Sequence, residues 1–276
     1  METENKAKED EAELQKILDF IHSYKGVDLS QYHQNFLFRR LRLRLQTTKS
    51  KDYLDYIKLL REAPEECNHF LDTLSINVTE FFRDPEVFEA FKKTVLSELI
   101  ARKEASQHRV VRIWSAGCAS GEEPYSIAIS AKEATKDRPG FLIKILGTDI
   151  DNDALEKARK AEYPEKELGK IKQDVLKKYF IRLDNQGYRV KDEIRQLVKF
   201  ENCNLSSEPS FKLLDAIFCR NVLIYLSHTQ KDALYHKFNQ LLNPGGYLVL
   251  SKVEMLWERN LFNVILPNEK IYQKVS

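Results

Sequence analysis

Apolar residues in the first part of the chain recur every three or four positions, which is the spacing of amphipathic helices. The pattern predicts one helix near 11–23 and two more around Tyr56 and Phe70. Residues 1–10 are almost all charged or polar, and they predict a solvated tail. We therefore expect a charged tail followed by a small all-helical domain over residues 11–76.

After about residue 108 the pattern changes, and short apolar runs alternate with amphipathic segments. Such alternation is typical of βαβ units, which build a parallel sheet with helices on both faces. We therefore predict an α/β, Rossmann-like domain over residues 77–276. Its expected strands lie in RVVRIWSAGC, FLIKILGTDID, QLVKFENCNL, LLDAIFCRNVLIYL and YLVLSKVEML, and its expected helices in EEPYSIAISAKEA, NDALEKARKAEY and QKDALYHKFNQLL.

Residues 177–193 interrupt this alternation. Two short strand runs flank Asp-Asn-Gln-Gly, and this order is a hairpin signal. We expect an inserted antiparallel β-subdomain here. It is either a structural element or an edge that binds a partner peptide.

The composition is that of an ordinary globular protein, with 42% hydrophobic and 31% charged residues among 276 and a net charge of +2. The four cysteines and six histidines occur in no metal-ligand spacing, so we expect no metal site. The charged N-terminus is unlike a signal peptide, and no apolar run is long enough to span a membrane. We therefore expect a cytoplasmic protein without membrane insertion.

Residues 37–61 are strongly basic, with eight Lys and Arg against two Asp, an excess of six positive charges. Leu and Arg alternate from 40 to 45 as in a strand, but Leu, Arg and Gln favour helices, so we predict a helix over 35–46. The segment is either a solvated basic face or a docking surface for an acidic partner. No nucleic-acid motif accompanies the charge, so nucleic acid is not expected. The candidate docking residues are Arg39, Arg40, Arg42 and Arg44.

The stretch WSAGCASGEEPYS at 114–126 reads as a strand, a glycine loop and the start of a helix. It is neither the dinucleotide fingerprint nor the P-loop, although Gly117 and Gly121 would let backbone approach a ligand closely. Glu122 and Glu123 suit the helix dipole, but they would repel a phosphate. The ligand is therefore expected to be uncharged or cationic at this end.

An acidic cluster, LGTDID at 146–151, ends the second predicted strand. An acid at this place can bind both hydroxyls of a ribose, and Asp149 is the candidate because it directly follows the apolar run. Asp151 is expected to cap the next helix. A nucleoside with a positive charge and no phosphate fits S-adenosylmethionine, although dinucleotide enzymes share the ribose site.

Five motifs occur together, in one order, over nearly the whole chain: INVTEFFRDPEVF (76–88), WSAGCASGEEPYSIAI (114–129), LGTDID (146–151), YRVKDEIRQLVKFENCNL (188–205) and DAIFCRNVLIY (215–225). With them the chain resembles the chemotaxis receptor methyltransferases, the CheR family. The resemblance implies a helical N-terminal domain followed by a class I methyltransferase domain with a small β-subdomain. It also implies methyl transfer from S-adenosylmethionine to glutamate side chains of chemoreceptors, which leaves S-adenosylhomocysteine.

The resemblance further implies roles for single residues, with Glu122 left as a helix-start acid. Arg220 stands out even apart from the family, because an Arg inside an apolar run is costly to bury without a partner. Arg83 and Tyr225 are expected to orient the incoming carboxylate and are the catalytic candidates. The implied cofactor contacts are Asn77, Thr79, Arg83, Gly117, Glu123, Asp149, Asn204, Leu205, Arg220 and Asn221.

The expected reaction is an in-line displacement at the sulfonium methyl group. A glutamate carboxylate, with a pKa of about 4.3, is already ionised at neutral pH, so no general base is needed. The motifs offer no histidine for that role. Alignment of the reactants is then the main task of the enzyme.

One stretch departs from the family, which often has Gly-His-Ser-Glu after its fifth strand. Here Leu250 to Glu254 read Leu-Ser-Lys-Val-Glu without a histidine, and no role is assigned to them. The expected partners are chemoreceptor cytoplasmic helices, with a receptor C-terminal peptide at 177–193 as an open possibility. The alternatives are a methyltransferase of the same fold acting on another protein or a small molecule, or a regulatory module that only binds the cofactor.

Overall fold

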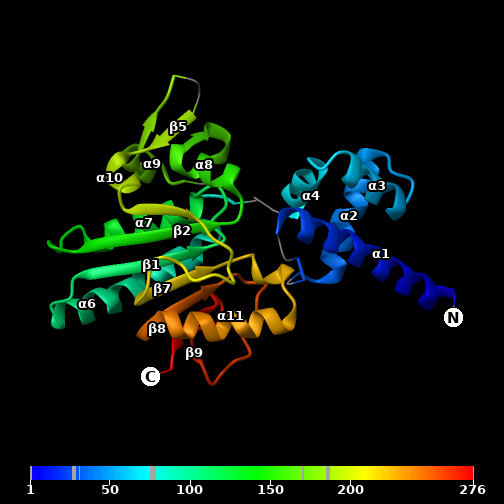
Figure 1. Cartoon of the computed structure of the whole chain (residues 1–276). Coiled ribbons are helices and arrows are strands. Elements are labelled where there is room, and N and C mark those ends of the chain that lie inside the picture. The colour runs from blue at the N-terminus through cyan, green and yellow to red at the C-terminus, as the bar shows by residue number, and fades with distance from the viewer. Residues whose placement is uncertain are drawn as a thin grey trace. The chain divides into compact units, whose positions relative to one another are not determined.

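The computed structural model describes residues 2–26, 29–30, 32–74, 79–169, 171–184 and 187–275, with side chains from residue 10 onward (Figure 1). The chain divides into two compact units. The helical unit contains Met1–Ile76 and Tyr225–Gln230, and the sheet unit contains Asn77–Ile224 and Lys231–Ser276.

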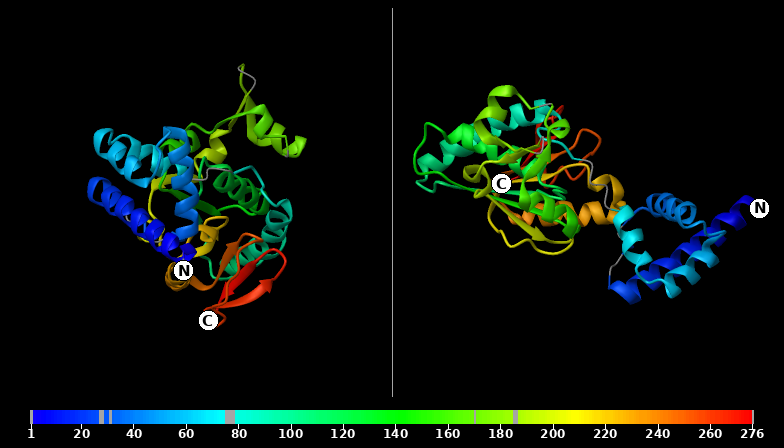
Figure 2. Two further views of the ribbon diagram at one scale, coloured as in Figure 1. Left: turned by 90° about the vertical axis from the view of Figure 1, so that its right-hand side faces the viewer. Right: turned by 90° about the horizontal axis from the view of Figure 1, so that it is seen from above.

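The helical unit is built from α1 (Glu2–Lys25), α2 (Gln34–Thr48), α3 (Tyr53–Glu62) and α4 (Glu66–Leu74). In Figures 1 and 2, α1 and α3 lie side by side. Apolar side chains at helical spacing on all four helices form one core, as the sequence pattern predicts. Its fully enclosed members include Ile17, Ile21, Leu41, Tyr56, Leu60, Cys67 and Phe70.

Two predictions for this unit have different outcomes. The helix predicted over 35–46 is confirmed as α2, which buries Leu37 and Leu41 on one face. The helix predicted near 11–23 begins earlier than expected, because α1 starts at Glu2, within the segment 1–10 predicted as a charged tail. The segment is rich in Glu, Lys and Ala, which are strong helix formers, so the helix extends beyond its buried stripe.

The sheet unit is centred on a seven-stranded sheet in the order β6-β2-β1-β7-β8-β10-β9. The first five strands in this order pair in parallel, which confirms the predicted α/β class. The two at the far edge are antiparallel additions that the sequence pattern does not predict. The bounds are β1 (Val110–Ala116), β2 (Leu142–Asp149), β6 (Val198–Asn202), β7 (Leu214–Cys219), β8 (Leu242–Leu250), β9 (Phe262–Leu266) and β10 (Ile271–Lys274).

Helices cover both faces of this sheet (Figure 1). On β1, Ile113 belongs to the core shared with α7, whereas the next residue, Trp114, packs against Phe238 of α11 at 5.6 Å between ring centroids. Successive residues of β1 therefore pack into two different cores, one on each face of the sheet. The covering elements are α5 (Pro85–Ala90), the π-helical turn η1 (Phe91–Leu96), α6 (Ser97–Ala105), α7 (Glu122–Thr135), α8 (Asn152–Lys160) and α11 (His228–Leu241).

An antiparallel sheet of three strands, in the order β3-β5-β4, lies in the chain between α8 and β6. Its β4 (Phe180–Arg182) and β5 (Gly187–Val190) confirm the predicted hairpin, although Asn185 and Gln186 of its turn lie outside the described residues. The third strand, β3, is not predicted, because three residues carry too little pattern. The remaining elements are β3 (Glu162–Pro164), η2 (Glu165–Glu167), α9 (Gln173–Tyr179) and α10 (Asp192–Arg195).

The strand order reverses direction next to β1. From β1 the chain moves outward to β2 and β6, and it returns on the other side of β1 with β7 and β8. The carboxyl ends of β1 and β7 lie at this switch point, and ligands of open α/β sheets bind at such a point. The loops concerned are 117–121 and 220–222.

Candidate active site

The loop after β1 is held against the loop after β7. The backbone N–H groups of Gly117 and Cys118 both donate to the carbonyl oxygen of Thr148, at 2.8 and 2.9 Å. Gly117 has φ of +79°, and a Cβ there would lie 2.4 Å from Cγ2 of Val222. Glycine is therefore required at this position for the two loops to pack together, whatever ligand binds.

Glu123, in the first turn of α7, has both carboxylate oxygens engaged. Ser115 Oγ donates to Oε1 at 2.8 Å, and a guanidinium nitrogen of Arg220 donates to Oε2 at 3.3 Å. Burial raises the pKa of Glu123 and outweighs the opposing effect of Arg220. This contact joins the end of β1 to the end of β7.

Arg220 is the centre of a network that extends to a third segment. Only 1% of its side chain is exposed, and its second terminal nitrogen pairs with the carboxylate of Asp84. Its guanidinium also lies over the ring of Phe88, 5.7 Å from the centroid. Nε of Arg220 is buried without a hydrogen-bond partner among the described residues. Sequence reasoning did not find Asp84, although it directly follows Arg83 in one of the quoted motifs.

Arg83 lies in a turn with unusual backbone geometry. Its two neighbours, Phe82 and Asp84, have φ of +51° and +56°, which is the left-handed region that non-glycine residues seldom adopt. The backbone N–H of Phe82 donates to Ser126 Oγ at 2.9 Å, and Asp84 is held by Arg220. Such strained backbone persists only where surrounding contacts fix it, and it is frequent at functional sites.

Asp149 ends β2 with its carboxylate turned toward the loop after β1. Its Oδ2 accepts from the Ala119 N–H at 2.8 Å, and its Oδ1 accepts from the Asp151 N–H at 3.0 Å. Burial raises the pKa of Asp149, although the backbone donors oppose this. Asp151 itself caps α8 by accepting from the Ala154 N–H, which confirms the cap predicted for it.

Asn204 and Leu205 follow β6, the strand that pairs with β2. Asn202 is the register partner of Asp149, and the Cys203 N–H donates to the Asp149 carbonyl oxygen at 3.0 Å. Oδ1 of Asn204 accepts from the Ser206 N–H at 2.9 Å, which shapes the loop. Asn204 and Leu205, two of the predicted cofactor contacts, therefore lie just beyond Asp149 at the same edge of the sheet.

Glu254, in the stretch that departs from the family pattern, supports the loop after β7. Its buried carboxylate accepts from the N–H groups of Val222, Leu223 and Ser251 at 2.9 to 3.0 Å. Asn221, just before these donors, has φ of +61°. Glu254 is thus a positioning residue that sequence reasoning missed, because its partners are backbone groups of a distant segment.

Glu122, the second acid of the loop, is buried at the start of α7, as a helix-start acid would be. Ser120 Oγ donates to its carboxylate at 2.9 to 3.0 Å. Burial raises the pKa of Glu122 to about 7. Near neutral pH this side chain is therefore only partly ionised.

Thr79 and Tyr225 are the remaining predicted residues that the structure describes. Thr79 is half-buried at the start of the described part of the sheet unit, and Asn77 lies outside the described residues. Tyr225 belongs to the helical unit, where its ring packs against Phe36 at 4.7 Å between centroids.

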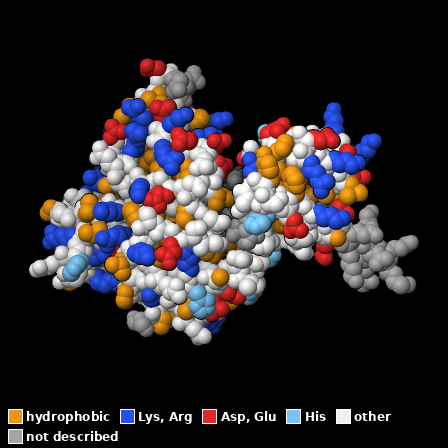
Figure 3. Space-filling view, in the orientation of Figure 1, with side chains coloured by type: hydrophobic (Ala, Val, Ile, Leu, Met, Phe, Trp, Pro, Cys, Tyr) orange, Lys and Arg blue, Asp and Glu red, His pale blue; other side chains and the backbone are white. Residues whose placement is uncertain are grey.

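The four arginines of α2 differ in their surroundings. Arg39 and Arg42 are exposed, whereas Arg40 lies over the ring of Phe36, 5.1 Å from its centroid. Arg44 makes two hydrogen bonds of 2.7 Å to Glu66 and is mostly buried. Lys and Arg side chains gather on the helical unit around α2 and α3 (Figure 3). The guanidinium of Arg44 ties α2 to α4. The candidate docking residues on α2 are therefore Arg39, Arg40 and Arg42.

The site in the sheet unit carries an excess of negative charge. Glu123 and Asp84 share the guanidinium of Arg220, and the carboxylate of Asp149 accepts from two backbone N–H groups. An excess of carboxylate at the carboxyl ends of the strands suits a cationic ligand, so these residues fit S-adenosylmethionine. Across the described residues, no group of three or more His, Cys, Asp or Glu is placed to hold a metal ion. No helix there is long and apolar enough to cross a membrane.

Fold and site together define a methyltransferase that uses S-adenosylmethionine, and comparison with known proteins agrees. Residues 77–270 match the family described as "CheR methyltransferase, SAM binding domain", and residues 12–75 match "CheR methyltransferase, all-alpha domain". The chain therefore belongs to the CheR methyltransferase family.

Curated relatives support this assignment over most of the chain. The chain is 33% identical over 260 residues to "Chemotaxis protein methyltransferase" of Borreliella burgdorferi, covering 92% of each chain. It is 36% identical over 242 residues to "Chemotaxis protein methyltransferase 2" of Pseudomonas aeruginosa, covering 85% of this chain and 83% of the other. The corresponding Salmonella typhimurium protein is 34% identical over 246 residues. The named relatives are thus methyltransferases of chemotaxis.

Proposed function

We propose that the protein transfers the methyl group of S-adenosylmethionine to glutamate side chains of chemoreceptors and so forms glutamate methyl esters. The observation that carries the proposal is the ion pair between Arg220 and Asp84. It ties the turn that contains Arg83 to the end of β7, where Arg220 also pairs with Glu123. The guanidinium of Arg83, held in this turn, suits an acidic side chain as the methyl acceptor.

Several residues of the sheet unit are proposed to hold the cofactor. Asp149 would accept hydrogen bonds from the ribose hydroxyls with the lone pairs that its two backbone donors leave open. Glu123 and Asp84 contribute the negative field that attracts a sulfonium. Gly117, Asn204, Leu205 and Asn221 shape the surrounding loops, and Thr79 and Asn77 remain proposed contacts.

When bound, S-adenosylmethionine supplies a sulfonium-activated methyl group to a carboxylate that is already ionised. The protein's part is to align the acceptor, and alignment contributes roughly 7–11 kcal/mol in well-oriented reactions. Arg83 would hold one carboxylate oxygen by a charge-assisted hydrogen bond, and Tyr225 would donate its hydroxyl. If Arg83 stabilised only the unreacted carboxylate, it would not lower the activation barrier of methyl transfer. Its proposed role is therefore to orient the carboxylate toward the methyl group.

The proposed substrates are acidic helices in the cytoplasmic part of the receptors, and the proposal therefore also places the protein in the cytoplasm. Arg39, Arg40 and Arg42 of α2 would dock these helices. A receptor tail peptide would add to an edge of the β3-β5-β4 sheet, where β3 and β4 each have one unpaired side.

One assay tests the function directly. The full chain is incubated with tritiated S-adenosylmethionine and chemoreceptor cytoplasmic fragments, and the labelled product is treated with base. Methyl esters release volatile methanol, so we expect base-labile counts on the fragments. Base-stable label would point instead to N-methylation, and cofactor binding without label would point to a regulatory module.

Two variants accompany the assay. Asp149→Ala should weaken binding of S-adenosylmethionine in calorimetry, and unchanged affinity would remove Asp149 from the site. The double variant Arg39→Ala/Arg42→Ala should weaken fragment binding and reduce its dependence on salt. Binding of the wild type that is insensitive to salt would contradict the docking face.

A further inference from the structure

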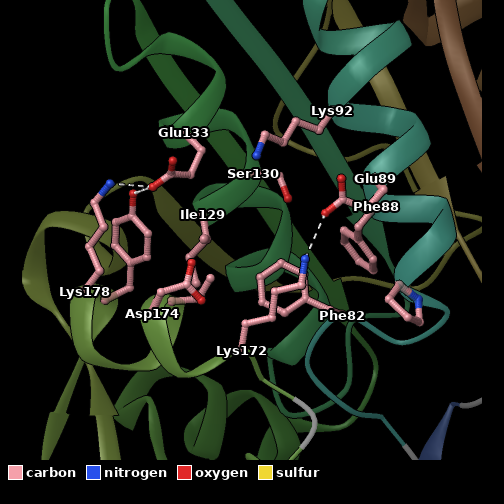
Figure 4. A pocket seen from close by; sticks show the side chains of 13 residues that line it. Phe82, Phe88, Glu89, Lys92, Ile129, Ser130, Glu133, Lys172, Asp174 and Lys178 are labelled. Atoms are coloured by element: carbon pink, nitrogen blue, oxygen red, sulfur yellow. Dashed lines mark hydrogen bonds and ion pairs between the residues drawn. The ribbon is translucent and has the colours of Figure 1, made fainter.

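A pocket of about 290 Å³ lies on the sheet unit (Figure 4). Its walls come from three elements: the turn and helix at 82–92, the face of α7 that carries Ile129, Ser130 and Glu133, and the segment 172–179 around α9. A volume of this size lies at the small end of ligand pockets and suits a molecule about as large as an amino acid.

The inner wall of the pocket is apolar. Phe82, Phe88, Ile129 and Val175 line it, and the two phenylalanine rings meet edge to face at 5.4 Å between centroids. This wall offers an apolar side chain a place away from water.

The rim of the pocket is charged, and most of its charges are paired. Lys172 lies 3.6 Å from Glu89, and Lys178 lies 2.6 Å from Glu133.

Two charged residues of the rim remain without such a pair. Lys92 and Asp174 both line the pocket, and neither is within 4 Å of an oppositely charged group among the described side chains, although Lys92 is close enough to Glu133 to help lower the pKa of that carboxyl. Figure 4 shows them reaching in from different walls, Lys92 beside Ser130 and Asp174 from α9. One unpaired cation and one unpaired anion around an apolar wall match a zwitterion with an apolar side chain.

The pocket is connected to the active site by two side chains of its own wall. Phe88 lines the pocket and also carries the guanidinium of Arg220 over its ring. Phe82 lines the pocket and directly precedes Arg83, and its N–H is anchored on Ser126 of α7. A ligand that shifts either ring would therefore act on the residues that position the methyl acceptor.

We propose that this pocket binds an amino acid with an apolar side chain, and that its occupancy changes cofactor binding through Phe82 and Phe88. The carboxylate of the ligand pairs with Lys92, its ammonium pairs with Asp174, and its side chain packs on Phe82, Phe88 and Val175. Leucine and phenylalanine are suitable probes because they carry an apolar group of the required size.

Isothermal titration of the full chain with L-leucine and L-phenylalanine tests the site. We expect saturable binding of at least one of them. We also expect binding at least about tenfold weaker for 4-methylpentanoate, which lacks the amino group of leucine, and for 3-methylbutylamine, which lacks its carboxylate. No saturable binding of either amino acid up to about 10 mM would overturn the proposal.

Variants separate this site from a general surface effect. Lys92→Met and Asp174→Asn should each weaken binding at least about tenfold. Lys136→Met is the control, because Lys136 is 59% exposed, pairs with Asp137, and neither residue lines the pocket. Equal binding by Lys92→Met and Lys136→Met would contradict the assigned contact.

The coupling has its own measurement. The affinity for S-adenosylmethionine, titrated with and without saturating leucine, should change by about fivefold or more, and the affinity for leucine should change by the same factor when the cofactor is saturating. An unchanged cofactor affinity would contradict the connection through Phe82 and Phe88. These are binding measurements, so their failure would leave the methanol-release test of the proposed function unaffected.

Discussion

Arg44 in the helical unit and Arg220 in the sheet unit are both buried arginines paired with glutamate, yet their surroundings differ. Arg44 meets one carboxylate, Glu66, through two hydrogen bonds of 2.7 Å, and Tyr56 donates a third at 2.8 Å. Arg220 meets two carboxylates from separate segments and keeps an unpartnered buried Nε. We call the cluster around Arg44 closed, because one arginine balances one carboxylate. We call the cluster around Arg220 open, because one arginine meets two carboxylates and one negative charge is left over.

The pKa values of the two glutamates reflect this difference. Burial favours protonation of Glu66, but hydrogen bonds from Arg44 and Tyr56 outweigh it, and the pKa is lowered. Burial dominates at Glu123, and its pKa is raised despite Arg220. The pair of Arg44 with Glu66 thus locks three helices together, whereas two carboxylates that share Arg220 leave negative charge that suits a cationic ligand.

The largest effect is expected at the open cluster. Arg220→Met would leave the buried Glu123 and the half-buried Asp84 without their cation, which costs about 3–5 kcal/mol of unfolding free energy. Binding of S-adenosylmethionine should weaken at least about tenfold, because the Arg83 turn loses its tie to β7. Urea unfolding and calorimetry measure the two effects. Wild-type cofactor affinity in this variant would show that the cluster is as purely structural as the one around Arg44.

A slightly smaller effect is expected at the closed cluster. Arg44→Met should destabilise the helical unit by about 3 kcal/mol, because Glu66 would stay buried beside Tyr56 without its cation. Cofactor affinity should not change, since every contact of Arg44 lies in the helical unit. The same two measurements apply, and a loss of cofactor affinity without a loss of stability would reverse the comparison.

A third prediction uses pH to separate acids of the two units. The pKa of Glu122 is about 7 in the folded chain and about 4.5 when unfolded, so its contribution to stability is present below about pH 4.5 and is lost as the pH rises through 7. Glu122→Gln should therefore gain stability over the wild type with rising pH, by up to about 3 kcal/mol above pH 8.

Glu66 should give the opposite sign, because its lowered pKa makes its stabilisation present at neutral pH and lost as the pH falls through the folded pKa. Urea unfolding of Glu122→Gln and Glu66→Gln across this range measures both slopes. Parallel slopes for the two variants would contradict the assigned burial effects.

The smallest change in free energy is expected for Arg83→Ala. Arg83 is half-buried in a surface turn, so the fold should survive. Methyl transfer should fall at least about tenfold, or about 1.4 kcal/mol of transition-state stabilisation, with cofactor affinity changed less. Single-turnover transfer to receptor fragments measures this. Wild-type turnover by the folded variant would remove Arg83 from the proposed mechanism.

Much of the fold followed from local patterns. The apolar runs of β1, β2, β6, β7 and β8 are long enough to be recognised alone, and the helical spacing of Leu37 and Leu41 outweighed the Leu-Arg alternation of α2. The acid at the end of β2, Asp149, and the N-cap of α8, Asp151, could also be predicted from the sequence. Strand ends and helix caps are defined by neighbours in the chain. The short edge strands β9 and β10 were not predicted, because five and four residues carry too little of an alternating pattern.

The sequence by itself determined the class of each unit, the order of the elements and the acids and arginines available for a site. Only the tertiary structure decided what each of these groups does. It turned Arg44 inward to Glu66, joined Arg220 to Asp84 across 136 positions, and brought Glu254 under the backbone of Val222. The physical reason is that periodicity records which face of an element is buried, whereas the energy of a charged group depends on which distant partners share that burial.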